Sequence, residues 1–214
     1  MAARRPYLNA AGKVVPSVTT IIGRFKESGG LIHWAWTEGC EGRDYRETRD
    51  AAASSGTLAH KMVECEIRGR KFDEGGLAGH LLEKANRALV MYREWAAQTQ
   101  LVPVQTEVRL VSERHQFGGT LDAISCAGRR ALLDWKTSGG IYVDYMIQLA
   151  AYRGLWDEAH PDEPIDGGCH LIRFSKEDAD FGHYYWSDLS DAWEAFILMR
   201  RLYDLDRQLK GRLK

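Results

Sequence analysis

The spacing of apolar residues predicts where helices lie in this chain. Leucines and aromatic residues recur at steps of three and four over 77–95 and again over 189–203. Such spacing places apolar side chains on one face of a helix, so two long helices with a buried face are expected. A further helix is predicted over 144–158. Residues 16–22 fit a short helix capped by Ser17, although their β-branched content also permits a strand.

Short runs rich in β-branched and aromatic residues predict strands between these helices. The first three runs lie close together, and residues 126–130 join the second to the third as a tight connection, which predicts an antiparallel meander. Together with the helices, the runs predict an α/β fold. The predicted strands are Thr106–Val111, Gly119–Ser125, Ala131–Thr137, Gly168–Phe174 and His183–Trp186.

Length and composition set the frame for any function. The chain has 214 residues, enough for one sizeable core, and no linker, repeat or low-complexity segment divides it. A single domain over residues 1–214 is therefore expected. Its 29 basic and 30 acidic residues nearly balance, so net charge alone does not point to a nucleic-acid partner.

The cysteines and the start of the chain suggest a cellular setting. The four cysteines are widely spaced without a Cys-x-x-Cys pair, which argues against a zinc site, an iron–sulfur cluster or a redox motif. No apolar run approaches the roughly 20 residues of a membrane span, and the first residues lack the apolar stretch of a secretory signal. A cytoplasmic protein that does not bind membranes is expected.

One predicted strand carries charges inside an apolar run. Residues 131–138 read ALLDWKTS, in which Asp134 and Lys136 interrupt the apolar letters. Side chains alternate faces along a strand, so these two project to one side while Leu133 and Trp135 pack on the other. From these residues alone, a salt bridge on an edge strand explains the pair as well as a functional site does.

The preceding strand adds a second carboxylate. Antiparallel pairing would bring Asp122 beside Asp134, and two carboxylates so close need a cation. Oxygen ligands suit Mg²⁺ or Mn²⁺, which bind phosphate oxygens readily. Such an ion polarises a phosphoryl group and lowers the pKa of a bound water, while Lys136 would orient or deprotonate that water and offset developing charge. Metal-assisted phosphodiester hydrolysis is the chemistry that follows.

Five short motifs occur together along the chain, and their combination is much rarer than any one of them. In this set the sequence resembles the PD-(D/E)XK nuclease superfamily, and within it the RecB-like exonucleases, including mitochondrial genome maintenance exonucleases and phage and bacterial relatives. The resemblance spans most of the chain and implies a restriction-endonuclease-like core, a central mixed β-sheet with an antiparallel meander flanked by helices. The motifs are Pro16–Thr20, Gly56–His60, Gly119–Asp122, Asp134–Ser138 and Gln148–Tyr152.

The resemblance also implies roles for individual residues. Lys136 would be the catalytic lysine, acting with Asp122 and Asp134. The metal ligands would be His60, Asp122, Asp134 and the main-chain carbonyl of Trp135, and the substrate-binding or supporting residues would be Gln148, Tyr152, Thr137 and Ser138. Gln148 and Tyr152 are four residues apart, so both would face the strand from one helix, although core packing of Tyr152 is an alternative.

Two further carboxylates are weaker candidates for the site. Glu64 lies four residues after His60 on a predicted helix, so both could face the metal, although a surface hydrogen-bonded pair is commoner. Glu107, on the first strand of the meander, is a candidate catalytic carboxylate at the edge of the site. A solvated strand carboxylate explains Glu107 equally well.

The sequence lacks two features that some members of the superfamily carry. Relatives that hold an iron–sulfur cluster use one cysteine before the nuclease core and three closely spaced ones after it, and Cys169 alone cannot supply that trio. No iron–sulfur cluster is therefore expected. No phosphate-binding Gly-x-x-x-x-Gly-Lys-Ser/Thr loop occurs either, which predicts a free-standing nuclease without its own motor.

Another polar stretch suggests a path for DNA. A polar stretch with Arg43, Tyr45, Arg46 and Arg49 follows Trp34 and Trp36. This mixture could track phosphates and stack bases of a single strand. A solvated loop with two core tryptophans explains the stretch equally well.

A metal-dependent exonuclease acting on single-stranded DNA or DNA ends is the favoured function, in DNA repair, recombination or phage DNA processing. Recombination or replication proteins are conceivable partners. The alternatives are a structure-specific endonuclease and a nucleic-acid-binding module with a vestigial site.

Overall fold

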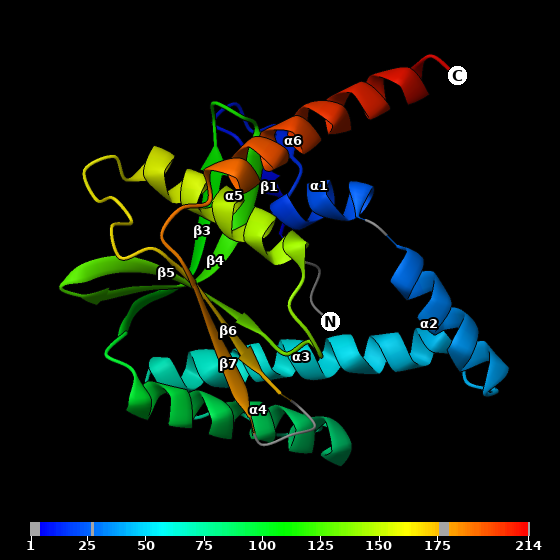
Figure 1. Cartoon of the computed structure of the whole chain (residues 1–214), viewed down its shortest axis with the longest axis vertical. Coiled ribbons are helices and arrows are strands. Elements are labelled where there is room, and N and C mark those ends of the chain that lie inside the picture. The colour runs from blue at the N-terminus through cyan, green and yellow to red at the C-terminus, as the bar shows by residue number, and fades with distance from the viewer. Residues whose placement is uncertain (1–4, 27, 176–179, 214) are drawn as a thin grey trace.

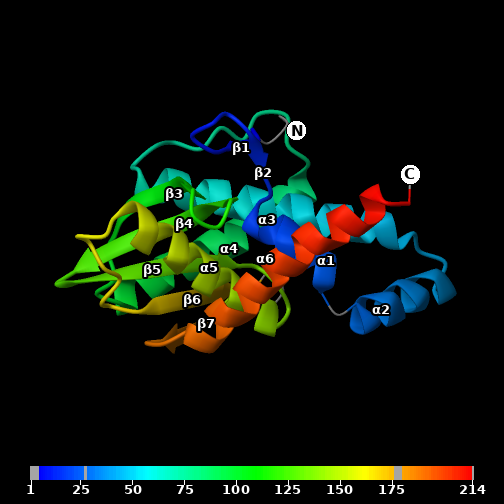
Figure 2. The same ribbon diagram turned by 90° about the horizontal axis from the view of Figure 1, so that it is seen from above.

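A five-stranded sheet forms the centre of the molecule, and helices cover both of its faces (Figures 1 and 2). The computed structural model describes residues 5–26, 28–175 and 180–213. The helices are α1 (Val18–Phe25), α2 (Gly29–Cys40), α3 (Tyr45–Ile67), α4 (Gly79–Gln98), α5 (Val143–Ala159) and α6 (Ser190–Gly211). The strands are β1 (Tyr7–Leu8), β2 (Val14–Val15), β3 (Pro103–Ser112), β4 (Phe117–Ala127), β5 (Arg129–Lys136), β6 (Cys169–Phe174) and β7 (Phe181–Trp186).

The sheet has the strand order β3-β4-β5-β6-β7 and is mixed. The strands β3, β4 and β5 form the predicted antiparallel meander. The pair β5–β6 is parallel, and α5 crosses over the sheet between the two strands, as a parallel connection requires. The predicted α/β architecture with a mixed central sheet is confirmed.

The predicted elements are present with small shifts at their ends. Within the stretch 16–22, residues 18–22 form the start of α1, and Ser17 caps this helix by accepting a hydrogen bond from the Thr20 N–H. The helix expected from Leu77 begins at Gly79, after the connection that carries Leu77. None of the helices in the described ranges is both long and apolar enough to cross a membrane.

Two apolar cores lie on opposite faces of the sheet. On one face, Leu121 and Leu132 pack with residues of α1, α5 and α6. On the other, Leu133 and Trp135 pack with residues of α3 and α4. Successive residues of β5 therefore enter different cores, which is the alternation that its sequence predicted.

Two adjacent glycines let neighbouring elements approach β4 closely. A Cβ atom on Gly118 would lie 2.5 Å from the ring of Tyr7 in β1, and one on Gly119 would lie 2.8 Å from Leu155 and Tyr152 in α5. Without those Cβ atoms, the β1–β2 hairpin and α5 can both pack on this part of β4. The Gly-Gly pair before Asp122 thus has a packing function.

A chain of aromatic hydrogen bonds ties α4 to the edge of the sheet. The Trp95 indole N–H donates to His183 Nδ1 over 3.3 Å, and His183 Nε2 lies 2.9 Å from His170 Nδ1. His170 Nε2 lies 3.1 Å from the Gly167 carbonyl oxygen. Only neutral rings can satisfy all three contacts, since a proton on either acceptor nitrogen would face another N–H.

Candidate active site

The charged pair of β5 lies in the interior of the sheet. Asp134 is buried with 1% of its surface exposed, and Lys136 Nζ forms an ion pair with Asp134 Oδ2. Both side chains project from the face opposite Leu133 and Trp135, as predicted. The interpretation as an edge-strand salt bridge is wrong in one respect, because β5 lies between β4 and β6.

Asp122 reaches the same place from β4. The paired register of β4 and β5 ends at Ala123–Leu133, and the next contact between the strands involves a side chain. The Trp135 N–H donates to Asp122 Oδ2 over 2.8 Å. A carboxylate therefore takes the position of a main-chain acceptor, which holds Asp122 against the strand that carries Asp134 and Lys136.

His60 approaches this cluster from α3. Its Nδ1 atom lies 3.6 Å from Asp122 Oδ2, and 29% of its side chain is exposed. Glu64, one helical turn further on, forms an ion pair with Arg68 over 2.9 Å. The structure therefore brings His60 to the carboxylates and pairs Glu64 with a helix neighbour.

Burial and mutual charge perturb every titratable group of the cluster. Burial raises the pKa of Asp134 to about 6, with repulsion from Asp122 adding to the effect and Lys136 opposing it. Burial also disfavours ionised Asp122, but His60, Lys136 and the Trp135 N–H hold its pKa below the ordinary value. Burial lowers the pKa of Lys136 and of His60, yet the neighbouring carboxylates outweigh burial and raise both.

The donor set is of the kind that a divalent cation uses. Asp134 Oδ2 is buried and, among the described residues, accepts no hydrogen bond, its contact being the ion pair with Lys136. The carboxylate oxygens of this set suit Mg²⁺ or Mn²⁺. Within the described ranges no three His, Cys, Asp or Glu side chains are arranged to enclose a metal. Water and phosphate oxygens would have to complete the coordination, which is the usual state of protein-bound Mg²⁺.

The residues after β5 and on α5 surround the cluster. Gln148 Nε2 lies 3.5 Å from Asp134 Oδ1 and donates to the Tyr152 hydroxyl over 2.9 Å. Tyr152 is buried in the α5 core, so its hydroxyl orients Gln148 from within the protein. The Ser138 hydroxyl donates to the Gly140 carbonyl, and Thr137 is partly exposed directly after β5.

Glu107 lies at the margin of the site. It stands in β3 between Thr106 and Val108, whose partners on β4 are Ala123 and Leu121, so it lies level with Asp122. Its φ angle is 54° and its side chain is exposed. A left-handed backbone is uncommon at a non-glycine residue, and the register between β3 and β4 continues across it.

The aromatic and basic stretch forms α2 and the start of α3, at the end of the molecule (Figure 2). Trp36 is 64% exposed, so it is not the core residue that one interpretation required. Arg43 forms ion pairs with Glu38 and Glu41, and Arg49 pairs with Asp50. Carboxylates therefore neutralise two of the three arginines, which weakens this stretch as a phosphate track.

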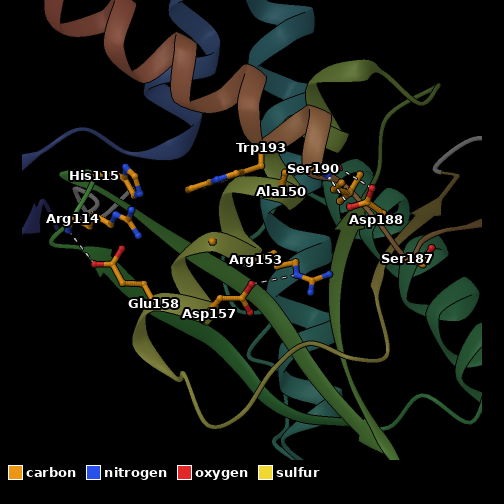
Figure 3. A pocket seen from close by; sticks show the side chains of 12 residues that line it. Arg114, His115, Ala150, Arg153, Asp157, Glu158, Ser187, Asp188, Ser190 and Trp193 are labelled. Carbon is orange, nitrogen blue, oxygen red and sulfur yellow. Dashed lines mark hydrogen bonds and ion pairs between the residues drawn. The ribbon is translucent and has the colours of Figure 1, made fainter.

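A separate hollow of about 480 Å³ lies between α5, the start of α6 and the turn joining β3 to β4 (Figure 3). None of the residues singled out from the sequence for the site lines it. Glu158 accepts hydrogen bonds from the Ser112 hydroxyl and the Arg114 N–H, and Asp188 caps Ser190. The carboxylates of Glu158 and Asp188 in this hollow thus accept hydrogen bonds from neighbouring residues.

Comparison with known proteins shows a likeness of structure and none of sequence. No model of a known protein family and no curated protein sequence matches the chain. The solved structures similar to this chain include a candidate exonuclease from Eubacterium rectale, with 13% identity and a TM-score of 0.50 over 73% of this chain and 66% of that one. They also include an alkaline exonuclease from Laribacter hongkongensis, with 11% identity and a TM-score of 0.35 over 74% and 86%.

The first of these comparisons establishes the fold. This chain spans just under two thirds of the Eubacterium rectale protein. The shared architecture is the restriction-endonuclease-like core that the resemblance implied.

Proposed function

We propose that this protein is a metal-dependent deoxyribonuclease that acts as an exonuclease on single-stranded DNA or on DNA ends. The observation that carries the proposal is the buried cluster in which Asp122, Asp134 and Lys136 meet. A fold alone does not fix an activity, whereas this cluster supplies groups that phosphodiester hydrolysis needs. The fold shared with a candidate exonuclease supports the same class.

Mg²⁺ or Mn²⁺ would be held by Asp122, Asp134, His60 and the main-chain carbonyl of Trp135, and when bound would polarise the phosphate and acidify a water. Lys136 would stabilise the negative charge that develops on the phosphate. Because the carboxylates raise its pKa, Lys136 keeps its proton at neutral pH, which favours this role over proton abstraction.

Other residues would position these groups or the substrate. The Tyr152 hydroxyl holds Gln148 in place, and Gln148 would orient the Asp134 carboxylate through its contact with Asp134 Oδ1. Thr137 and Ser138 follow the catalytic strand directly and would contact the DNA backbone. Glu107 would act from the rim as an outer carboxylate.

The test is cleavage of end-labelled linear single-stranded DNA with Mg²⁺ or Mn²⁺, with chelator as a control. Lys136→Met and Asp134→Asn should lower the cleavage rate by about 10² to 10³-fold while folding and DNA binding persist. The matched controls Lys84→Met and Asp162→Asn change exposed residues and should cleave at the wild-type rate. Full activity in Lys136→Met would contradict the site assignment.

The substrate separates the alternatives. Closed circular single-stranded DNA should remain intact if the enzyme needs an end, and its cleavage would instead indicate a structure-specific endonuclease. Intact DNA under every condition, with binding retained, would indicate a vestigial nuclease site in a DNA-binding module.

A further inference from the structure

The last helix carries apolar side chains on two opposite faces. Toward the body of the protein, Phe196, Met199 and Tyr203 of α6 pack in the core with α5. On the outer face, Leu198, Leu202, Leu205 and Leu209 are exposed by 63%, 48%, 36% and 58%. Because a lone surface helix needs only one apolar stripe, the outer leucines indicate that another surface covers them.

The spacing of the outer leucines is that of a helix pair. Steps of four, three and four residues place all four side chains in a narrow stripe, the pattern of a coiled-coil seam. The order of these steps is the same from either end of the helix. In an antiparallel pair of two α6 helices, Leu198 would meet Leu209 of the second copy and Leu202 would meet Leu205.

Charges at the two ends of the stripe favour the same arrangement. The exposed Asp191 and Glu194 extend the outer face toward the start of α6, and the exposed Arg212 extends it toward the end. Antiparallel packing sets the acidic start of one helix beside the basic end of the other, and it also opposes their dipoles favourably. Parallel packing would set like charges together.

Nothing else in the described part of the molecule competes for this face. Figures 1 and 2 both show α6 along the outside of the molecule, with its C-terminal end extending beyond α1. The contact with α1 uses a different side of the helix, through the ion pair between Arg24 and Asp206. The outer stripe is therefore accessible along its length.

We infer that this protein forms a two-fold homodimer through antiparallel packing of the outer leucine stripe of α6. The helix is 22 residues, or about 33 Å, long. A single helix pair lies at or below the low end of stable interfaces, about 1,200 Å², so the dimer should dissociate in the micromolar range. The inference does not depend on the proposed nuclease activity.

Sedimentation velocity over about 1 to 100 μM tests the inference, because a weak dimer must respond to concentration in this range. Wild-type protein should shift from monomer to dimer, and the double variant Leu202→Glu, Leu205→Glu should stay monomeric with unchanged circular dichroism. Ile32→Glu alters a leucine-sized, 65% exposed side chain on α2 and should dimerise like the wild type.

Charge reversal tests the antiparallel arrangement. Glu194→Arg and Arg212→Glu should each weaken dimerisation by about tenfold or more, and the double reversal should restore it. A monomer at every concentration, or a dimer that survives the leucine change or is broken by Ile32→Glu, would overturn the inference. Failure of the double reversal to restore dimerisation would overturn the antiparallel register.

Discussion

Replacing Asp134 with asparagine should stabilise the folded protein at neutral pH, although it removes one partner of an ion pair. Burial, together with Asp122, raises the pKa of Asp134 to about 6 from an ordinary value of 3.8, and Lys136 only partly offsets the effect. At about 1.4 kcal/mol for each pKa unit, this rise in the pKa of Asp134 corresponds to about 3 kcal/mol. Ionised Asp134 therefore lowers the free energy of unfolding by about that amount, and asparagine removes this cost while keeping the shape.

The sign of the pH dependence follows from proton binding. Between the two pKa values the folded state binds more protons at Asp134 than the unfolded state does, so stability rises as pH falls. The contribution is lost as pH rises through the folded pKa of about 6. The advantage of Asp134→Asn should thus be about 3 kcal/mol above pH 7 and should vanish near pH 4.

Urea unfolding in chelator at several pH values measures the effect. Taking the difference between Asp134→Asn and wild type cancels the titration of groups that both proteins share, and Asp162→Asn controls for loss of an exposed carboxylate. A variant less stable than wild type above pH 7 would refute the reasoning. It would mean that leaving Lys136 buried without its partner costs more than the crowding of two carboxylates.

Three further changes test the packing and hydrogen bonds at the site and at the edge of the sheet. Gly119→Ala should cost about 1–3 kcal/mol of stability in urea unfolding, because its Cβ would lie 2.8 Å from Leu155 and Tyr152, whereas Gly139→Ala meets nothing within 4 Å and should be near neutral. Tyr152→Phe should keep the core packing and lower the DNA cleavage rate by about tenfold or more, because Gln148 loses its hydrogen-bond acceptor at 2.9 Å. An unchanged rate would contradict the proposal that the Tyr152 hydroxyl positions Gln148. Burial lowers the pKa of His170 and of His183, so the stability of the wild type should fall relative to that of His170→Gln as pH drops below about 6.5. The same difference in unfolding free energy between the two proteins at pH 7.5 and at pH 5 would contradict this.

Much of the fold could be predicted because local patterns and tertiary packing agree. The alternation in 131–136 and the helical period in 77–95 each place apolar side chains where the two cores need them. The short strands β1 and β2 carry no such period, because each has two residues. The helix α2 was missed for a similar reason, since its described residues bury only Glu38 and leave Leu31, Ile32 and Trp36 exposed.

The candidate site was predictable in its charged centre and less so at its rim. Asp122, Asp134 and Lys136 could be placed together because strand pairing and alternation are regular rules. The partners of Glu64 and Arg43 could not be predicted, because either side chain has several charged neighbours within reach in the sequence. Only the folded geometry shows that Glu64 pairs with Arg68 and Arg43 with Glu38.

The hydrogen bond from the Trp135 N–H to Asp122 Oδ2 links a main-chain amide directly to the centre of the site. Any ligand that draws this carboxylate away must weaken the bond, so the nitrogen-15 resonance and hydrogen-exchange rate of this amide should follow occupancy. Trp135 would then act as an internal spectroscopic reporter. Titrations could be observed even in a Lys136→Met protein that turns over no substrate, separating binding from chemistry.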